Sequence, residues 1–402
     1  MSSGEAELLS RILSAISSKG FGLAGQLLIA AVVFKLFGVA QVGTFGVLQG
    51  TASLILMSLS LAMPRLAAVR FGYYSYSFFL GATFCAIMTS CILYILVILL
   101  ASDSGLYVAT IVFLLKSSDL VVELNSVFYR KRKLDSRLAS SQAKRFSWVL
   151  FSSGLAFFAS LALGEYLTVL LVGYLCSFVR DLRFLGFRTD ALAISRSIYA
   201  YKILLTKARS NALGALLSSA TTTSPRYAAL WWFGAEYAGA YYLVSYVYLA
   251  VTIFWSLVMQ LMIVSVKDLL VMWREIERRI LMFMVVFYGV AFFCLHAFGE
   301  YFFSFLTIDI VGLNASLLAE WLLAASIPLV LRELYSYKAF KLGLFKGYNL
   351  VSLVGLAVFW GGWLCFASRD QFVHIGSILL VANICTAISI YIYLLQVRRR
   401  LG

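Results

Sequence analysis

The sequence FGVAQVGTF at residues 37–45 returns as FGAEYAGAY at residues 233–241, so both stretches read F-G, four residues, G, one residue and an aromatic ring. The two copies are 196 positions apart, and SLAM at residues 60–63 matches SLVM at residues 256–259 at the same spacing. Two ungapped matches at one spacing indicate an internal duplication. Each copy joins one apolar segment to the next, so the sequence predicts two related lobes.

The composition excludes a soluble protein. Hydrophobic residues make up 62% of the chain and charged residues 13%, and the mean hydropathy is +0.92. This much apolar surface predicts an all-α polytopic membrane protein in direct contact with the lipid bilayer. The net charge of +15 is therefore expected to mark the sidedness of the loops, and we predict no nucleic-acid partner. The first apolar segment is too long for a cleavable signal and carries Lys19 and Gln26.

Twelve apolar segments have a length of about 20 residues, which is enough to cross the hydrocarbon core. They are residues 13–36, 44–64, 77–101, 105–127, 146–164, 166–184, 206–224, 238–263, 280–298, 312–331, 348–367 and 375–397. Every second connection is basic: these connections hold 28 of the 33 Lys and Arg residues, Arg332 among them, and the others hold only Arg226 and Arg369. The positive-inside rule then predicts twelve transmembrane helices with both termini in the cytoplasm.

The duplication divides the predicted spans into two lobes of six. We predict an N-terminal lobe at residues 1–190, a cytoplasmic connection at 191–205 and a C-terminal lobe at 206–402. Lobes with six spans each have the same orientation, so a pseudo-twofold axis along the membrane normal should relate them. The longest connections, 128–145 and 185–205, are both basic and predicted to be cytoplasmic.

The fourth predicted span carries charges at its centre. Lys116, Asp119 and Glu123 are spaced i, i+3 and i+7, which places them on one face of a helix. Charges inside a span are costly and mark candidate functional sites. Two interpretations are open. The face is a polar wall of a transport pathway with carboxylates for a proton or cation, or Lys116 and Asp119 form a local pair that neutralises itself.

The first and seventh spans are equivalent in the duplication, and both are polar. The first carries Lys19 and Gln26, and the seventh begins with Lys207, Arg209 and Asn211. Binding cavities of two-lobed transporters form between such equivalent spans. No Walker A motif, nucleophile–base pair or metal-ligand spacing is present, so we predict no enzyme, no cofactor and no metal site.

The chain resembles the bacterial polysaccharide flippases of the multidrug/oligosaccharidyl-lipid/polysaccharide (MOP) exporter superfamily, which are related to the MATE transporters. The resemblance lies in the twelve spans with both ends inside, the two six-span lobes, the repeated stretches at 37–45 and 233–241, and the basic connections at 128–145 and 185–205. It extends over essentially the whole chain.

This resemblance implies a flippase of the bacterial inner membrane for an oligosaccharide repeat unit on undecaprenyl diphosphate, as used for O-antigen or a related surface glycan. It implies alternating access, a cationic cavity between the lobes, and a polymerase and a chain-length regulator as partners. A diphosphate needs Lys or Arg to enter a low-dielectric region. The candidates are Lys19, Lys116, Arg145 and Arg209, with Gln26 and Asn211 beside them and Asp119 and Glu123 for ion coupling.

Two other functions compete with this one. A multidrug or organic-cation antiporter of the same fold would favour acidic residues in its cavity, whereas the charges within these spans are mainly basic. A membrane O-antigen polymerase or ligase would need a large external loop for its chemistry, and the predicted outer loops are short.

Overall fold

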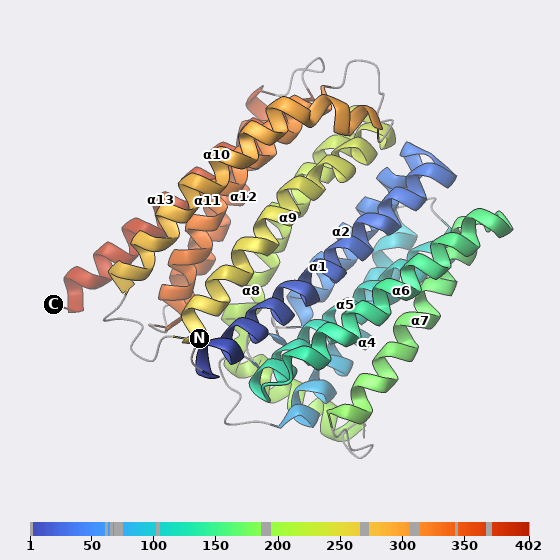
Figure 1. Cartoon of the computed structure of the whole chain (residues 1–402), viewed down its shortest axis with the longest axis horizontal. Coiled ribbons are helices and arrows are strands. Elements are labelled where there is room, and N and C mark those ends of the chain that lie inside the picture. Colours follow the sequence, from blue (N-terminus) through green and yellow to red (C-terminus); the bar gives the residue numbers. More distant parts are fainter. Residues whose placement is uncertain are drawn as a thin grey trace. The chain divides into compact units, whose positions relative to one another are not determined.

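The computed structural model describes residues 3–60, 63–64, 67, 75–101, 105–185, 194–265, 273–305, 314–341, 345–366 and 372–401. Within these ranges the regular structure is entirely helical (Figure 1). The helices are α1 (Ser3–Phe37), α2 (Val39–Leu59), α4 (Tyr76–Ala101), α5 (Leu106–Lys131), α6 (Asp135–Ala159), α7 (Leu163–Phe184), α8 (Ile194–Phe233), α9 (Ala235–Ser265), α10 (Trp273–Phe305), α11 (Ala315–Lys341), α12 (Phe345–Phe366) and α13 (His374–Leu401).

Each predicted span overlaps one of these helices. Eight helices of the described part (α1, α2, α4, α7, α9, α10, α11 and α13) contain a stretch long and apolar enough to cross a membrane, and α12 has a shorter apolar stretch at Asn349–Cys365. The chain is therefore a multi-pass membrane protein. Helices α5, α6 and α8 carry more polar residues, so the total of twelve crossings stays a prediction, as does the side that the termini face.

The two copies of the repeated stretch have the same backbone geometry. Gly38 separates α1 from α2 with a φ of 86°, and Gly234 separates α8 from α9 with a φ of 97°. In each copy the glycine N–H donates to the carbonyl oxygen four residues earlier, at 2.9 Å for Gly38 and 3.0 Å for Gly234. The turn in each copy is much shorter than the repeated stretch. The second glycines, Gly43 and Gly239, are already buried inside the next helix.

Replacing Gly38 or Gly234 with alanine is expected to lower the free energy of unfolding by about 1–3 kcal/mol, because non-glycine residues rarely adopt this backbone conformation. A Cβ at either position would have no neighbour within 4 Å, so the loss would come from the backbone alone. Thermal unfolding in detergent measures it. Gly20→Ala is the control, since Gly20 lies inside α1 with equally open space and without a positive φ. If Gly38→Ala is as stable as this control, the proposed strain does not exist.

Where the structure describes them, the predicted basic connections are mostly helical, which corrects the sequence-based boundaries. Helix α5 continues to Lys131 and α6 begins at Asp135, so only residues 132–134 of the predicted connection 128–145 lie between helices. Helix α8 begins at Ile194, inside the predicted connection 191–205. Hydropathy identifies the apolar part of a helix, whereas the helix itself continues while its residues are good helix formers. The predicted lobe boundaries themselves stay a prediction.

A Schellman motif ends α5. Leu134 N–H donates to Tyr129 O at 2.8 Å and Lys133 N–H donates to Arg130 O at 3.0 Å, the two hydrogen bonds of this motif. Lys133 has a φ of 57°, in the left-handed region where glycine is preferred. A side chain at this position costs roughly 1–2 kcal/mol.

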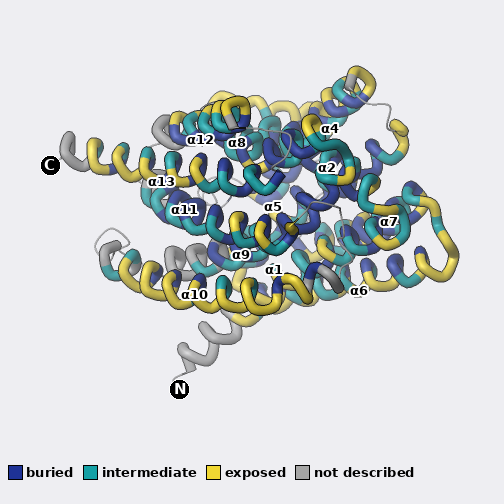
Figure 2. Tube along the Cα trace, turned by 90° about the horizontal axis from the view of Figure 1, so that it is seen from above, coloured by how far each residue is buried: buried dark blue, intermediate teal, exposed yellow. Residues whose placement is uncertain are grey.

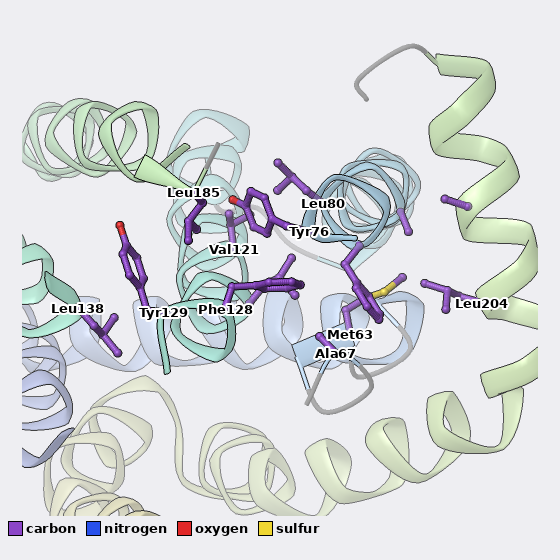
Figure 3. Close-up of a cluster of buried hydrophobic side chains, with 14 residues drawn as sticks. Met63, Ala67, Tyr76, Leu80, Val121, Phe128, Tyr129, Leu138, Leu185 and Leu204 are labelled. Carbon is purple, nitrogen blue, oxygen red and sulfur yellow. The ribbon is translucent and has the colours of Figure 1, made fainter. Parts of the chain in front are cut away.

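The chain forms two compact units, Met1–Arg226 and Tyr227–Gly402. In the first unit a buried apolar cluster connects α4, α5, α6 and α8 near the end of α5 (Figure 3). Phe128 is 1% exposed within it, and the Tyr76 hydroxyl donates to Asn125 Oδ1 at 2.8 Å. This cluster fixes the end of α5 against its neighbours.

In the second unit a core of α9, α10 and α11 is built around Trp255, Tyr288 and Leu334. The opposite face of α10 is strongly exposed and apolar (Figure 2). Val285 is 75% exposed and Phe293 is 70% exposed. Such a surface is stable only against lipid, in agreement with the membrane assignment.

Candidate functional site

Helix α6 buries a face that carries polar side chains. Its buried residues include Ser141, Arg145, Val149 and Ser152, and their spacing of three and four places them on one side of the helix. This helix packs against α1, α5 and α7. The Arg145 side chain is therefore carried into the interior of the first unit.

Small residues let α1 lie close to α6. A Cβ on Gly25 would be 3.8 Å from Val149 Cγ2 and 3.9 Å from the Phe146 ring, so the helix backbone lies against these side chains. The rings of Phe21 and Phe146 also contact each other, with centroids 5.8 Å apart.

Arg145 is a buried charge of this interior. It is 5% exposed. Its Nη2 lies 3.5 Å from Ser118 Oγ, and its guanidinium carbon lies 5.0 Å from the centroid of the Tyr174 ring. The Nε is buried and has no acceptor among the described residues. The negative charges of Asp119 and Asp181 attract the guanidinium from a distance. Neither carboxylate is in ion-pair contact with it in the described part. A buried guanidinium is costly without an anion, so this geometry can accept one.

On α5 the structure shows the local pair. Lys116 Nζ lies 3.4 Å from Asp119 Oδ2, and the two side chains are 18% and 34% exposed. Glu123, one turn further along, is exposed and is not part of this contact. The interpretation that Lys116 and Asp119 neutralise each other therefore describes this conformation.

Lys19, on α1, is influenced by charges on α5. It is half-buried, and the charges of Glu123 and Arg130 both act on its ammonium group. Gln26, two turns further along α1, is also half-buried. The structure thus places Lys19, Lys116, Asp119, Glu123 and Arg145 in one unit on neighbouring helices.

Hydroxyl groups of the polar seventh predicted span are satisfied within their own helix, α8. The hydroxyls of Thr221, Thr223 and Ser224 donate to carbonyl oxygens three or four residues earlier in α8, at 2.7–3.3 Å. Such bonds satisfy hydroxyls within their own helix. The side chains of Arg209 and Asn211 lie outside the described residues, so the predictions for them stay predictions.

Sequence reasoning missed a buried carboxylate on α7. Asp181 is 2% exposed. It accepts hydrogen bonds from the Tyr129 hydroxyl at 3.2 Å and from the Ser141 hydroxyl at 2.9 Å. Arg180 donates to Ser141 Oγ at 3.2 Å. These contacts connect α5, α6 and α7 beside Arg145. The only signal in the sequence was an acid at the end of an apolar span.

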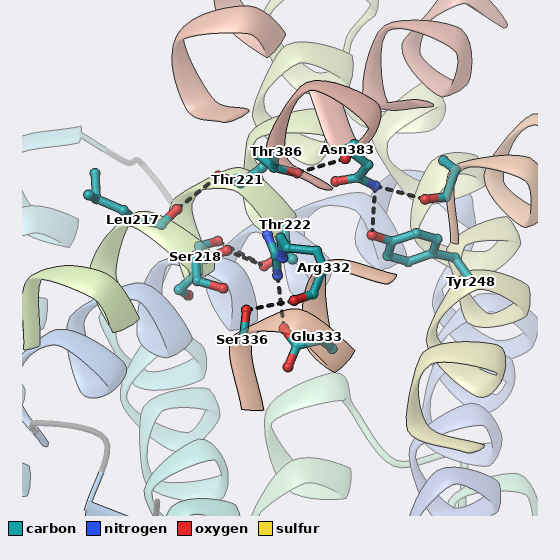
Figure 4. Close-up of polar contacts among 12 residues, drawn as sticks. Leu217, Ser218, Thr221, Thr222, Tyr248, Arg332, Glu333, Ser336, Asn383 and Thr386 are labelled. Carbon is teal, nitrogen blue, oxygen red and sulfur yellow. Dashed lines mark hydrogen bonds and ion pairs between the residues drawn. The ribbon is translucent and has the colours of Figure 1, made fainter. Parts of the chain in front are cut away.

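A second buried arginine lies in the second unit. Arg332 was predicted in a basic loop, but α11 continues through it and it is 2% exposed. It donates to Glu333 Oε1 at 3.1 Å, and nearby Asn383 Nδ2 lies 3.3 Å from the Tyr248 hydroxyl (Figure 4). From the sequence alone, a charged residue that follows an apolar segment inside a helix cannot be distinguished from a charged residue in a loop.

Comparison with solved structures identifies the architecture. An inward-facing multidrug resistance MATE family transporter of the MOP superfamily superposes with a TM-score of 0.66 at 11% identity, over 96% of this chain and 97% of that chain. A mutant of the Vibrio cholerae MATE transporter VcmN gives 0.64 at 14% identity, over 98% and 97%. The chain has the MATE transporter fold.

A further similar structure is described by its binding pocket. It is a MOP superfamily transporter from Pyrococcus furiosus, described by a reverse polarity of its binding pocket that suggests a different function, with a TM-score of 0.56 at 12% identity over 96% of this chain and 94% of that chain. No protein-family model and no curated protein sequence matches the chain.

Proposed function

We propose that this chain is a flippase that moves oligosaccharide repeat units on undecaprenyl diphosphate across the bacterial inner membrane, for O-antigen or a related surface glycan. The observation that carries the proposal is Arg145, a buried guanidinium without a carboxylate in ion-pair contact within the described residues. A phosphate group is a suitable ligand for it, because arginine binds phosphate oxygens through two parallel N–H donors.

The surrounding charges suit a diphosphate. Lys19 lies on α1 and Lys116 on α5, and both helices pack against α6. Lys116 pairs with Asp119, and the charge of Glu123 acts on Lys19 from a distance. A diphosphate that binds Arg145 would compete with these carboxylates for the two lysines. Binding would therefore release Asp119 or Glu123 from its cation and make it available for a proton or cation, which is how we propose that transport is coupled.

Transport by this fold proceeds through alternating access. The diphosphate binds on the cytoplasmic side, the protein changes conformation, and the site opens to the other side while the lipid tail remains in the bilayer. A polymerase and a chain-length regulator would act on the delivered units as partners.

Deletion of the gene in its host tests the proposal. We expect loss of surface glycan and accumulation of single lipid-linked repeat units on the cytoplasmic leaflet. The wild-type gene and Lys144→Gln, which changes the exposed neighbour of Arg145, should restore the glycan, whereas Arg145→Gln should not. Unpolymerised units in the periplasm would instead indicate a polymerase.

A multidrug antiporter is the second candidate. It is favoured by Asp119 and Glu123, which can bind an organic cation, and by the multidrug resistance transporter of the same fold. In that case the deletion would leave surface glycan normal and change only the tolerance to cationic drugs.

A further inference from the structure

The turn between α5 and α6 presents an exposed basic surface. Its cations are Lys131, Arg132 and Lys133 at the turn, Arg137 in the first turns of α6 and Arg183 at the end of α7, all exposed. We call these five residues the basic turn. Arg132 Nη1 donates to Leu185 O at 3.2 Å, which holds the end of α7 against the turn. The charges thus form one surface although they come from three helices.

The acidic residues described close to this surface are buried. Asp135 is the one acidic residue between positions 124 and 164, and it is 6% exposed. Asp181 is 2% exposed and accepts its hydrogen bonds from Tyr129 and Ser141. These two carboxylates are thus buried, whereas the cations of the basic turn are exposed. A dense positive surface of this kind fits a polyanionic partner.

The basic turn lies beside a lipid-facing surface. The guanidinium of Arg137 lies 5.2 Å from the centroid of the Phe184 ring, which is 53% exposed. Val179, on the last turns of the same membrane helix α7, is 48% exposed. Exposed apolar side chains next to cations are typical of the boundary between hydrocarbon and headgroups. Lipid phosphates would lie at the level of the basic turn.

The backbone of Lys133 gives an independent argument. In the described residues only Lys133 and Ser160 have a positive φ without being glycine. Glycine at position 133 would relieve the strain of the Schellman motif. A lysine at this position keeps its charge at the tip of the turn at the expense of backbone stability, and strained residues gather at functional positions.

We propose that the basic turn binds the phosphate headgroups of anionic membrane lipids. The lipid phosphates contact the exposed ammonium and guanidinium groups, and the exposed ring of Phe184 lies among the upper acyl carbons. This contact fixes the end of the α5–α6 hairpin in the headgroup layer. It is independent of what the protein transports.

The test uses the purified full-length chain in a non-ionic detergent and follows its thermal unfolding. It is titrated with dihexanoyl phosphatidylglycerol, with dihexanoyl phosphatidylcholine and with inorganic phosphate. Phosphatidylglycerol should raise the Tm of the wild type in a salt-sensitive manner, because a ligand of the folded state stabilises it. The other two should not.

Two glycine variants separate charge from backbone. Lys133→Gly should raise the Tm without lipid and weaken the apparent affinity for phosphatidylglycerol about fivefold, as expected for one basic residue at an anionic surface. Ser160→Gly relieves the same kind of strain at the other end of α6, so it should raise the Tm and leave the affinity unchanged. Equal affinities for both variants would overturn the proposal. A response to inorganic phosphate equal to that to phosphatidylglycerol would also overturn it, because the ligand would then be a free anion.

Discussion

Arg145→Gln is expected to weaken binding of inorganic pyrophosphate to the purified chain about 30- to 150-fold, because loss of a buried charge-assisted contact costs roughly 2–3 kcal/mol. Arg145 is 5% exposed and has no carboxylate in ion-pair contact in the described part. No described carboxylate is in ion-pair contact with Arg145, so its removal deprives no acid of a contact cation, and the fold should be as stable as before or more stable. Isothermal titration calorimetry in detergent measures the binding, and thermal unfolding measures the stability.

Three variants make this result specific. Lys144→Gln removes an adjacent but exposed cation and should leave affinity almost unchanged. Arg145→Lys keeps the charge but lacks the planar pair of donors, so its affinity should lie between those of the wild type and Arg145→Gln. Lys116→Gln should have a smaller effect than Arg145→Gln, because Lys116 already has Asp119 as a partner at 3.4 Å.

The same titration separates the two candidate functions. Tetraphenylphosphonium, an organic cation, should bind weakly to the wild type and should not compete with pyrophosphate. If Arg145→Gln and Lys144→Gln weaken pyrophosphate binding equally, the effect comes from overall charge and the proposed site is wrong. If the wild type binds tetraphenylphosphonium and not pyrophosphate, the antiporter hypothesis replaces the flippase.

The sequence predicted the helical membrane class because hydropathy depends on composition alone. The repeated glycines could also be recognised in the sequence, because the positive φ at positions 38 and 234 favours glycine there. The helix ends were less predictable. Its basic composition predicts that 128–145 connects two spans, but its residues are good helix formers, and tertiary packing continues α5 and α6 into it.

The candidate site was only partly predictable for the same reason. The spacing of Lys116 and Asp119 fixed their common helical face, but only the structure shows that they pair. Arg145 was a candidate for its charge, whereas its burial depends on the packing of α6 against other helices. Asp181 was missed because its partners Tyr129 and Ser141 are distant from it in sequence. Arg332 was missed because α11 continues beyond its apolar part.

Gly173→Ala is expected to lower the free energy of unfolding by about 2–4 kcal/mol, the sum of overpacking and a weakened hydrogen bond. Gly173 is buried on α7, and a Cβ on it would overlap the indole ring of Trp148 on α6. The ring cannot easily move, because its Nε1 donates to Val169 O at 2.9 Å. Helices α6 and α7 would have to separate at this level.

The position of Gly173 connects this packing to the site. The next residue is Tyr174, whose ring lies 5.0 Å from the Arg145 guanidinium. Gly173→Ala should therefore also weaken pyrophosphate binding, although it changes no charge. Thermal unfolding and calorimetry on the same preparation report the two effects.

Gly154→Ala is the matched control on α6, because a Cβ there would have no neighbour within 4 Å. It should leave binding unchanged and stabilise the helix by up to about 1 kcal/mol. Trp148→Phe in the Gly173→Ala background makes room for the new methyl group and should recover part of the lost stability, although Trp148→Phe alone costs its indole hydrogen bond. A Gly173→Ala protein as stable as the Gly154→Ala protein would show that α6 and α7 are not in tight contact here. The Arg145 site would then have to be held by other contacts, such as those of Asp181 with Tyr129 and Ser141.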